Sequence, residues 1–158
     1  MSPGPPQVSP TTVAELLKAG ACDLAEALDA AGCVISRLVG ELIIEIAEQS
    51  QSGKSLHLGY GYLLSEYPLT DEAVRERAPR TVSLHDPHPD PQEAKLLHEL
   101  GFDSLLMLPL ECGGEVWGLV EIYRTGVGFD EDAVDTAAAI VARLAALLEP
   151  LEKARRQG

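Results

Sequence analysis

The chain has 158 residues, a length that one domain with a single hydrophobic core accounts for. Hydrophobic residues make up 46% of the sequence but aromatic residues only 4%, so leucine, valine, isoleucine and alanine must build the core. The formal net charge of −13 argues against binding to nucleic acid or to an anionic membrane surface, because either requires a basic face.

The sequence predicts a cytoplasmic protein. It contains no run of roughly 18–20 apolar residues of the kind that crosses a membrane. Residues 1–10, "MSPGPPQVSP", have no basic start or apolar centre of a secretory signal, and their prolines predict a disordered lead-in. Three cysteines without a CxxC pair indicate a reducing compartment.

The first half of the chain begins with a helix. Apolar residues recur every three or four positions from Thr11 until Gly32 ends the pattern. Two β-rich runs follow at 33–39 and 42–49, and the short glycine-containing link between them predicts an antiparallel hairpin. A third strand is expected within 56–65.

The middle of the chain predicts two short helices and a strand. A helix over 70–79 is expected to start at Thr70 as N-cap and to stop at Pro79. A strand at 81–84 follows. The next helix has Asp90 as N-cap, Pro91 at its first position and Gly101 at its end.

The last third of the chain predicts a strand hairpin and a long helix. The runs at 104–110 and 115–124 pair across the turn at Gly113 and Gly114. Alternation places Trp117, Glu121 and Tyr123 on one face of the second run. The final helix starts near Asp130, and Pro150 is expected to kink or end it.

This order of elements predicts an α+β fold with one mainly antiparallel sheet. The terminal helices must cover one face of the sheet, and the helical insert is left to cover the other.

The sequence resembles the GAF domain family, a sensory module of bacterial and eukaryotic signalling proteins. The resemblance is carried by "LGFDSLLMLPLECGGEVWGLVEIY" followed by "GFDEDAVDTAAAIVARLAALL", and it extends over residues 11–151. It implies a sheet of about five or six strands, a ligand pocket under the insert, and dimerisation through the terminal helices. Residues 152–158 would be the end of a signalling helix or a tail.

The resemblance does not identify a ligand or cofactor. A bilin-binding GAF domain needs a cysteine on the insert side of the pocket, and Cys22, Cys33 and Cys112 do not match that position. The same mismatch argues against a GAF-type methionine sulfoxide reductase. The nucleotide-binding signature lacks its Asn-Lys half, since the chain has no asparagine.

The histidines leave two alternatives open. His85, His88 and neighbouring aspartates have donor types that bind divalent metals, but the prolines between them favour an extended, solvated loop. His85 and His98 are candidates for a haem ligand, although no haem motif accompanies them.

The predicted ligand pocket combines tyrosines, a carboxylate and loop residues. Tyrosines clustered after residue 59 can close a pocket or form ordinary core. A carboxylate at Glu121 would favour a ligand that carries an amine or another donor. The expected pocket residues are Tyr60, Tyr62, Tyr67, Ser83, His85, Asp86, Leu97, Phe102, Glu121 and Tyr123.

The terminal helices predict a homodimer, because their apolar residues and the alanines of 133–146 suit a four-helix bundle. The expected interface residues are Leu17, Leu24, Leu28, Ala137, Val141, Leu144 and Leu148.

The sequence therefore favours a non-catalytic sensory domain that binds a small molecule and passes the change to a downstream signalling domain. No nucleophile–base pair, carboxylate pair or metal set indicates catalysis. A ligand-free dimerisation module and a methionine sulfoxide reductase are the alternatives.

Overall fold

The computed structural model describes residues 12–53, 56 and 60–157. The proline-rich lead-in predicted for residues 1–10 lies outside the described residues. Helix α1 (Val13–Ala27) begins where Thr12 accepts a hydrogen bond from the backbone N–H of Glu15 at 3.1 Å.

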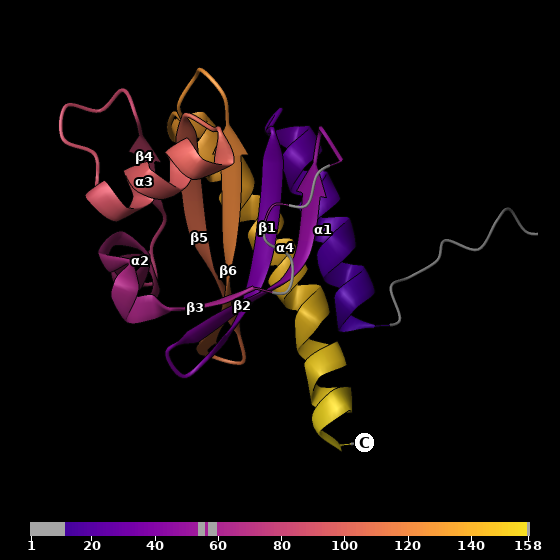
Figure 1. Cartoon of the computed structure of the whole chain (residues 1–158). Helices are drawn as coiled ribbons and strands as arrows, with labels where there is room; N and C mark the ends of the chain where they lie inside the picture. Colours follow the sequence, from indigo (N-terminus) through magenta and orange to yellow (C-terminus); the bar gives the residue numbers. More distant parts are fainter. Residues whose placement is uncertain (1–11, 54–55, 57–59, 158) are drawn as a thin grey trace, which may run out of the picture.

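The sheet has six antiparallel strands in the order β3-β2-β1-β6-β5-β4 (Figure 1). The strands are β1 (Gly32–Val39), β2 (Leu42–Ser50), β3 (Gly61–Leu63), β4 (Arg80–Ser83), β5 (Ser104–Cys112) and β6 (Glu115–Arg124). The hairpins predicted around Gly40 and around Gly113 and Gly114 are confirmed. Part of the region expected to hold the third strand lies outside the described residues.

The insert between β3 and β5 contains a short 3-10 turn (Leu64–Glu66), α2 (Pro68–Glu76) and α3 (Pro91–Leu100). The prediction that Thr70 caps α2 is wrong, because the helix already starts at Pro68, and proline suits the first helical position. The start of α3 is as predicted, since Asp90 accepts the N–H of Glu93 at 3.1 Å.

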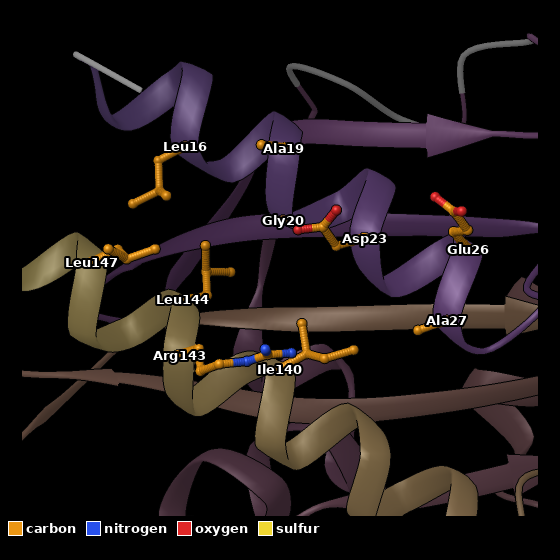
Figure 2. A pocket seen from close by; sticks show the side chains of 10 residues that line it. All are labelled: Leu16, Ala19, Gly20, Asp23, Glu26, Ala27, Ile140, Arg143, Leu144 and Leu147. Atoms are coloured by element: carbon orange, nitrogen blue, oxygen red, sulfur yellow. The ribbon is translucent and has the colours of Figure 1, made fainter. Parts of the chain in front are cut away.

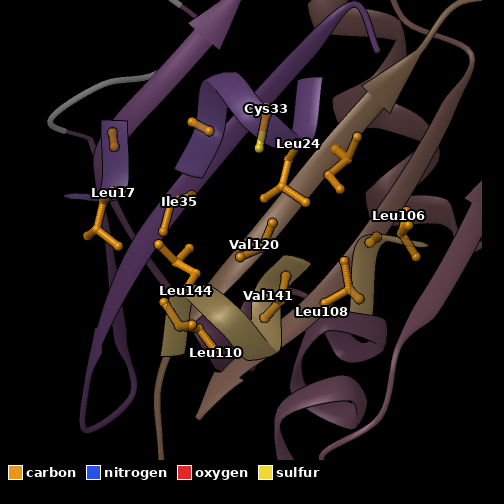
Figure 3. Packing of buried hydrophobic residues seen from close by; sticks show 14 of the residues in the cluster. Leu17, Leu24, Cys33, Ile35, Leu106, Leu108, Leu110, Val120, Val141 and Leu144 are labelled. Carbon is orange, nitrogen blue, oxygen red and sulfur yellow. The ribbon is translucent and has the colours of Figure 1, made fainter. Parts of the chain in front are cut away.

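Helices α1 and α4 (Glu131–Gln157) pack on one face of the sheet, and the insert lies on the other (Figure 1). The helix-side core joins leucines of both helices to strand residues such as Ile35, Leu108 and Val120 (Figure 3). A smaller core on the insert side contains Val34, Leu97 and Leu105. The α+β architecture predicted from the sequence is thereby confirmed.

Pro150 was predicted to kink or end the final helix; helix α4 continues through it to Gln157, so the second alternative is wrong. Proline removes the hydrogen bond to the carbonyl four residues earlier, that of Ala146. Both Pro150 and Ala146 are exposed, so water can bond that carbonyl. Among the described residues, no helix is long and apolar enough to span a membrane.

Strand β6 lies in the middle of the sheet and sends alternate side chains to the two cores. Val120 and Ile122 pack with the terminal helices, whereas Leu119 and Tyr123 pack under the insert. The predicted placement of Trp117 on the insert face is wrong. The register shifts between Leu110 and Glu111, so Trp117 is skipped in the pairing and turns to the helix side.

The seven residues predicted to form the dimer interface are instead buried within one chain. All of them belong to the helix-side core and are at most 6% exposed. They cannot supply an exposed surface, because one apolar stripe of each helix is used to cover the sheet. The residues that need this correction are Leu17, Leu24, Leu28, Ala137, Val141, Leu144 and Leu148.

The close approach of β1 and β6 at Gly118 gives a test of the packing. A Cβ atom built on Gly118 would lie 2.1 Å from the backbone oxygen of Ser36. Gly118→Ala should therefore lower the free energy of unfolding by about 3 kcal/mol or more, measured by chemical denaturation. Gly128→Ala is the matched control, since its nearest neighbour would lie at 3.8 Å. Equal stability of the two variants would contradict the observed strand pairing.

Candidate functional site

The centre of the candidate site is Glu121, a carboxylate on the insert face of β6 that is only 2% exposed. The hydroxyl of Tyr62 donates to its Oε1 at 2.8 Å, and that of Tyr123 donates to its Oε2 at 3.0 Å. One donor comes from β3 and the other from β6 itself. The two tyrosines therefore orient the carboxylate and satisfy one acceptor site on each oxygen.

Two further glutamates are buried near Glu121. Glu93, on the first turn of α3, is 1% exposed, and its Oε1 accepts the hydroxyl of Thr70 at 2.6 Å. Glu45, on β2, is 5% exposed. The Oε2 atoms of Glu93 and Glu45 are both buried without a hydrogen-bond partner among the described residues. Such unpaired buried oxygens are costly and call for an explanation.

Burial is the main cause of abnormal titration in all three carboxyls. It raises the pKa of Glu45 to about 9 and that of Glu93 to about 7, and in both cases repulsion from Glu121 adds to the effect. Burial also raises the pKa of Glu121, although the two tyrosine hydrogen bonds oppose this. Among the described residues, no basic side chain contributes to any of these shifts.

Aromatic rings form part of the wall around the carboxyl groups. Tyr62 and Tyr67 meet edge to face with centroids 4.9 Å apart, and Phe102 stacks on Tyr123 at 5.1 Å. Burial raises the pKa of Tyr62 and Tyr123 well above the ordinary value, and the charge on Glu121 acts in the same direction. Both hydroxyls therefore stay protonated and remain hydrogen-bond donors at neutral pH.

Six of the ten residues predicted to form the pocket lie around this cluster. Tyr62, Tyr67, Glu121 and Tyr123 contribute polar groups or rings, and Leu97 and Phe102 belong to the insert-side core or pack on it. Whether these residues contact a ligand is a prediction that the fold alone does not test.

Of the other four predicted residues, Tyr60, His85 and Asp86 are exposed and Ser83 is half-buried. Tyr60 is 67% exposed. Ser83, His85 and Asp86 stabilise their own turn after β4, where Asp86 accepts the Ser83 N–H at 2.9 Å and the Ser83 hydroxyl accepts the His85 N–H at 3.1 Å. In these contacts the side chains of Ser83 and Asp86 accept hydrogen bonds from backbone N–H groups of their own turn, as is common in polar turns.

Sequence reasoning missed Glu45, Glu93 and Thr70. Glu93 has the spacing of a helix-capping residue, and Thr70 was assigned to a helix start, so each already had a local explanation. Glu45 stands in a strand between apolar residues, where a carboxylate on a covered face was a usable signal. Its face could be assigned only with the bulge between Ile35 and Ser36, where the β1–β2 register shifts.

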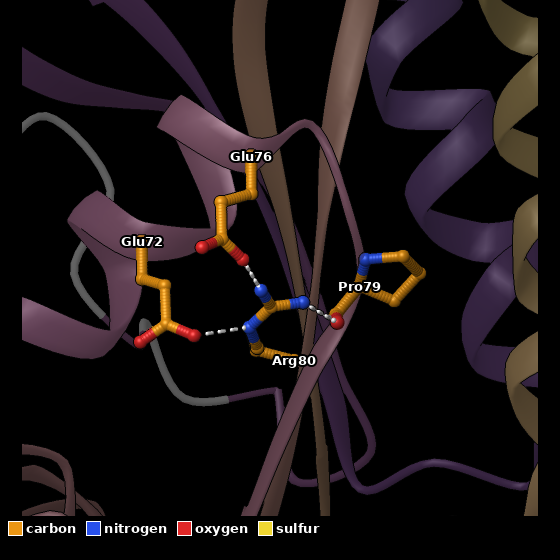
Figure 4. A network of polar contacts seen from close by, with 4 residues as sticks. All are labelled: Glu72, Glu76, Pro79 and Arg80. Atoms are coloured by element: carbon orange, nitrogen blue, oxygen red, sulfur yellow. Dashed lines mark hydrogen bonds and ion pairs between the residues drawn. The ribbon is translucent and has the colours of Figure 1, made fainter.

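The insert is tied to the edge of the sheet by an ionic network on its outer side (Figure 4). Arg80 of β4 donates from Nε to Glu72 at 2.9 Å and also pairs with Glu76, both on α2. A further Arg80 nitrogen donates to the carbonyl oxygen of Pro79 at 2.9 Å. Exposed ion pairs of this kind stabilise weakly, so the network mainly positions α2 beside β4.

The three cysteines lie away from the insert face. Cys33 is fully buried in the helix-side core, and Cys112 packs against that same core. Burial raises the pKa of both thiols, so neither has the thiolate character that a nucleophile needs. Cys22 lies on α1, where its sulfur is 3.3 Å from the side-chain oxygen of Gln49.

A groove of about 600 Å³ runs between the outer faces of α1 and α4 (Figure 2). Leu147, which is 58% exposed, and Ile140 give its α4 side an apolar surface. Asp23 and Glu26 on α1 and Arg143 on α4 add charges of both signs. The helices approach closely at Gly20, where a Cβ atom would lie 2.9 Å from the side chain of Leu144.

The sequence model of the GAF domain matches residues 12–148, which is most of the chain. The chain belongs to the GAF domain family. No curated protein matches it in a sequence comparison.

Solved GAF structures have the same fold as this GAF domain. The phycocyanobilin-bound GAF domain of a cyanobacterial phytochrome is similar at 20% identity and a TM-score of 0.77, over 88% of this chain and 85% of that one. The chromophore-binding domain of the Stigmatella aurantiaca bacteriophytochrome is similar at 18% identity and a TM-score of 0.71, over 85% of this chain.

A third similar structure is the chromophore-binding domain of an unusual R. palustris bacteriophytochrome, at 13% identity and a TM-score of 0.77 over 90% of this chain. This GAF domain spans 53% of the Stigmatella chain and 57% of the R. palustris chain. At these identities the likeness establishes the fold.

The raised pKa of Glu93 predicts a stability that depends on pH. The folded chain binds this proton more tightly than the unfolded chain, so the Glu93 contribution is complete below pH 4.5 and is lost as the pH rises through about 7. Glu93→Gln should therefore raise the free energy of unfolding at pH 8 by roughly 2 kcal/mol and change it little at pH 4.5. The contribution of Glu45 should be lost only as the pH rises through about 9, so the stabilising effect of Glu45→Gln should keep growing up to that pH.

Chemical denaturation at pH 4.5 and pH 8 measures this difference. Glu115→Gln, at the exposed end of β6, removes the same charge outside the cluster and serves as the control. A Glu93→Gln effect of the same size at both pH values would contradict the buried, proton-binding state of the carboxyl.

Proposed function

We propose that this GAF domain is a non-catalytic cytoplasmic sensor, part of a bacterial signalling protein, that binds a small molecule between the sheet and the insert. The observation that carries the proposal is the buried polar cluster around Glu121. Three carboxyls and two tyrosine hydroxyls are buried on the insert side of the sheet. Two of the carboxyl oxygens have no hydrogen-bond partner among the described residues. A ligand that donates hydrogen bonds to these oxygens would offset the free-energy cost of burying them.

The similar phytochrome structures support a sensory role, since two are chromophore-binding domains and the third is a GAF domain with bound phycocyanobilin. A thiol-linked bilin is a poor choice for this chain. Its three cysteines lie in α1, in the helix-side core and at the end of β5, and none points into the insert-side core. The proposed ligand is therefore held without a covalent bond.

The proposed signal leaves through the terminal helices. Glu121 is bracketed on β6 by Val120 and Ile122, which belong to the core formed with α1 and α4. Ligand binding shifts the population between two arrangements of the insert, and the strand passes this difference to the helices. A downstream domain linked to α4 would receive it.

The proposal is tested by native mass spectrometry of the purified chain before and after unfolding. We expect excess mass on the folded species that disappears on denaturation. Glu121→Gln should reduce the fraction of chain that carries this mass, because the substitution removes the central charge of the site. Glu115→Gln should carry the same mass as the wild type. A clean apo mass in the wild type, with no stabilisation by any metabolite fraction, would contradict the sensor proposal.

A ligand-free dimerisation module is the second candidate. The ring contacts of Tyr62 with Tyr67 and of Phe102 with Tyr123 favour it, because they fill space on the insert side. A methionine sulfoxide reductase is disfavoured, since the buried Cys33 and the half-buried Cys22 and Cys112 do not converge on one site.

We also propose that the domain forms a homodimer through the groove between α1 and α4. The apolar Leu147 and Ile140 would pack on a second copy, and Arg143 would meet Asp23 or Glu26 of the partner subunit across a twofold axis. Leu147→Glu should give a folded monomer by sedimentation velocity. Leu63→Glu, at a 45% exposed leucine on β3, is the matched control and should remain dimeric. A wild-type chain that is monomeric at high concentration would contradict the proposal.

A further inference from the structure

We infer that the insert-face site selects a small organic cation, an ammonium group on an apolar body, held by Glu45, Glu93 and Glu121. This inference rests on the sensor function proposed above and adds the chemical class of the ligand. It starts from the donor and acceptor inventory of the site, in which three elements, β2, α3 and β6, each contribute one buried carboxyl.

The site has more buried acceptor oxygens than hydrogen-bond donors among the described residues. Glu121 already accepts one tyrosine hydroxyl on each oxygen, and Glu93 accepts one threonine hydroxyl. The Oε2 atoms of Glu45 and Glu93 accept nothing among the described residues. An ammonium group brings three N–H donors and a positive charge, so it can donate to one of these oxygens and oppose the repulsion that Glu121 exerts on Glu45 and Glu93.

Other ligand classes fit less well. A phosphate or carboxylate would add negative charge beside Glu121, whose charge already acts against ionisation of Glu45 and Glu93. A neutral alcohol offers one donor and no charge. Among the described residues, no group of three or more histidine, cysteine or acidic side chains is arranged to hold a metal ion.

The surroundings of the acids are suited to an apolar ligand body. Leu97, Met107 and Leu119 are at most 1% exposed and lie in the insert-side core, and the Phe102 and Tyr123 rings stack beside them. An aromatic or aliphatic chain attached to the ammonium would bury its surface there.

Binding should release protons, because in the absence of a cation Glu45 is protonated at neutral pH and Glu93, with a pKa of about 7, is partly protonated. The ammonium keeps its own protons, and each carboxyl that ionises against it gives one proton to solvent. Affinity should therefore rise between pH 6 and pH 8. The titratable groups that face the two carboxyls are Glu48, Tyr62, Tyr67, Asp90, Glu121 and Tyr123.

The test is isothermal titration of the full chain, freed of bound ligand by refolding, with three matched probes: 2-phenylethylamine, 2-phenylethanol and phenylacetate. A second set, hexylamine, hexanol and hexanoate, varies the body. We expect an amine to bind at least about tenfold more tightly than its alcohol and acid. The heat should change with the ionisation enthalpy of the buffer, which measures the released protons.

Variants assign the effect to the cluster. Glu93→Gln and Glu121→Gln should each weaken amine binding at least about tenfold, whereas Glu115→Gln should leave it within about twofold. Glu93→Gln keeps an oxygen for the Thr70 hydroxyl and is expected to be no less stable than the wild type, so its loss of binding would not reflect unfolding. Glu121→Gln keeps an oxygen for only one of the two tyrosine hydroxyls, so its fold is checked by chemical denaturation alongside the titration.

The outcomes separate this inference from the sensor proposal. Equal or tighter binding of an alcohol or acid overturns the selection of cations and leaves a small-molecule sensor in place. If no amine binds, the inference is also overturned, and the native mass spectrum decides the sensor proposal separately. A neutral or anionic adduct in that spectrum retains the sensor, and a clean mass removes it.

Discussion

The burial of β6 on both faces is the constraint on which the rest of the structure depends. A strand covered on both sides must send successive side chains into two different environments. Val120 and Ile122 meet the terminal helices, whereas Leu119, Glu121 and Tyr123 meet the insert. The strand also lies between β1 and β5, so its backbone cannot move without disturbing both neighbours. The absence of a side chain at Gly118, against the Ser36 carbonyl, shows how little room that pairing leaves.

This constraint makes the acidic cluster costly. A carboxyl on the insert face of β6 is out of contact with water, and the neighbouring Glu45 and Glu93 are buried as well. Two tyrosine hydroxyls and one threonine hydroxyl offset part of the desolvation, and protonation of the acids offsets more. A chain selected only for stability would place leucine or glutamine at these positions. Local departures from stable packing are typical of functional sites, and here the departure involves three elements that meet in one place.

The sequence predicted the fold well, because the signals that define it are local or periodic. Glycine turns fixed two hairpins, Asp90 and Pro91 fixed the start of α3, and the strand pattern placed Glu121 and Tyr123 under the insert. The errors arose where tertiary context decides. A bulge that no local signal marked turned Trp117 to the helix side, and solvent exposure allowed α4 to pass Pro150.

The site was predicted in part, since its residues from α3 and β2 join Glu121 only through the register of the sheet and the docking of the insert. The stripe assigned to a dimer covers the sheet instead, because periodicity shows that a face is apolar but not what covers it.

The position of the acids also explains how a ligand under the insert would act on helices behind the sheet. Protein interiors are close-packed. A shift of β6 caused by a change of charge at Glu121 would therefore displace the side chains that Val120 contacts on the helix side. Strands β1 and β6 are joined to each other beside the lower end of α4: Arg37 of β1 donates to the carbonyl oxygen of Trp117 at 3.0 Å and lies 4.4 Å from the centroid of its ring, and both residues line the same hollow as Arg156. Near that end of the helix, Glu152 is buried and paired with Arg155, which lowers the pKa of this carboxyl. Strands β1 and β6 thus have the acidic cluster on one face and the core that includes α4 on the other. A cation that promotes ionisation within this cluster would favour one arrangement of these two strands, and α4, which extends past the end of the sheet (Figure 1), would carry that preference away from the site.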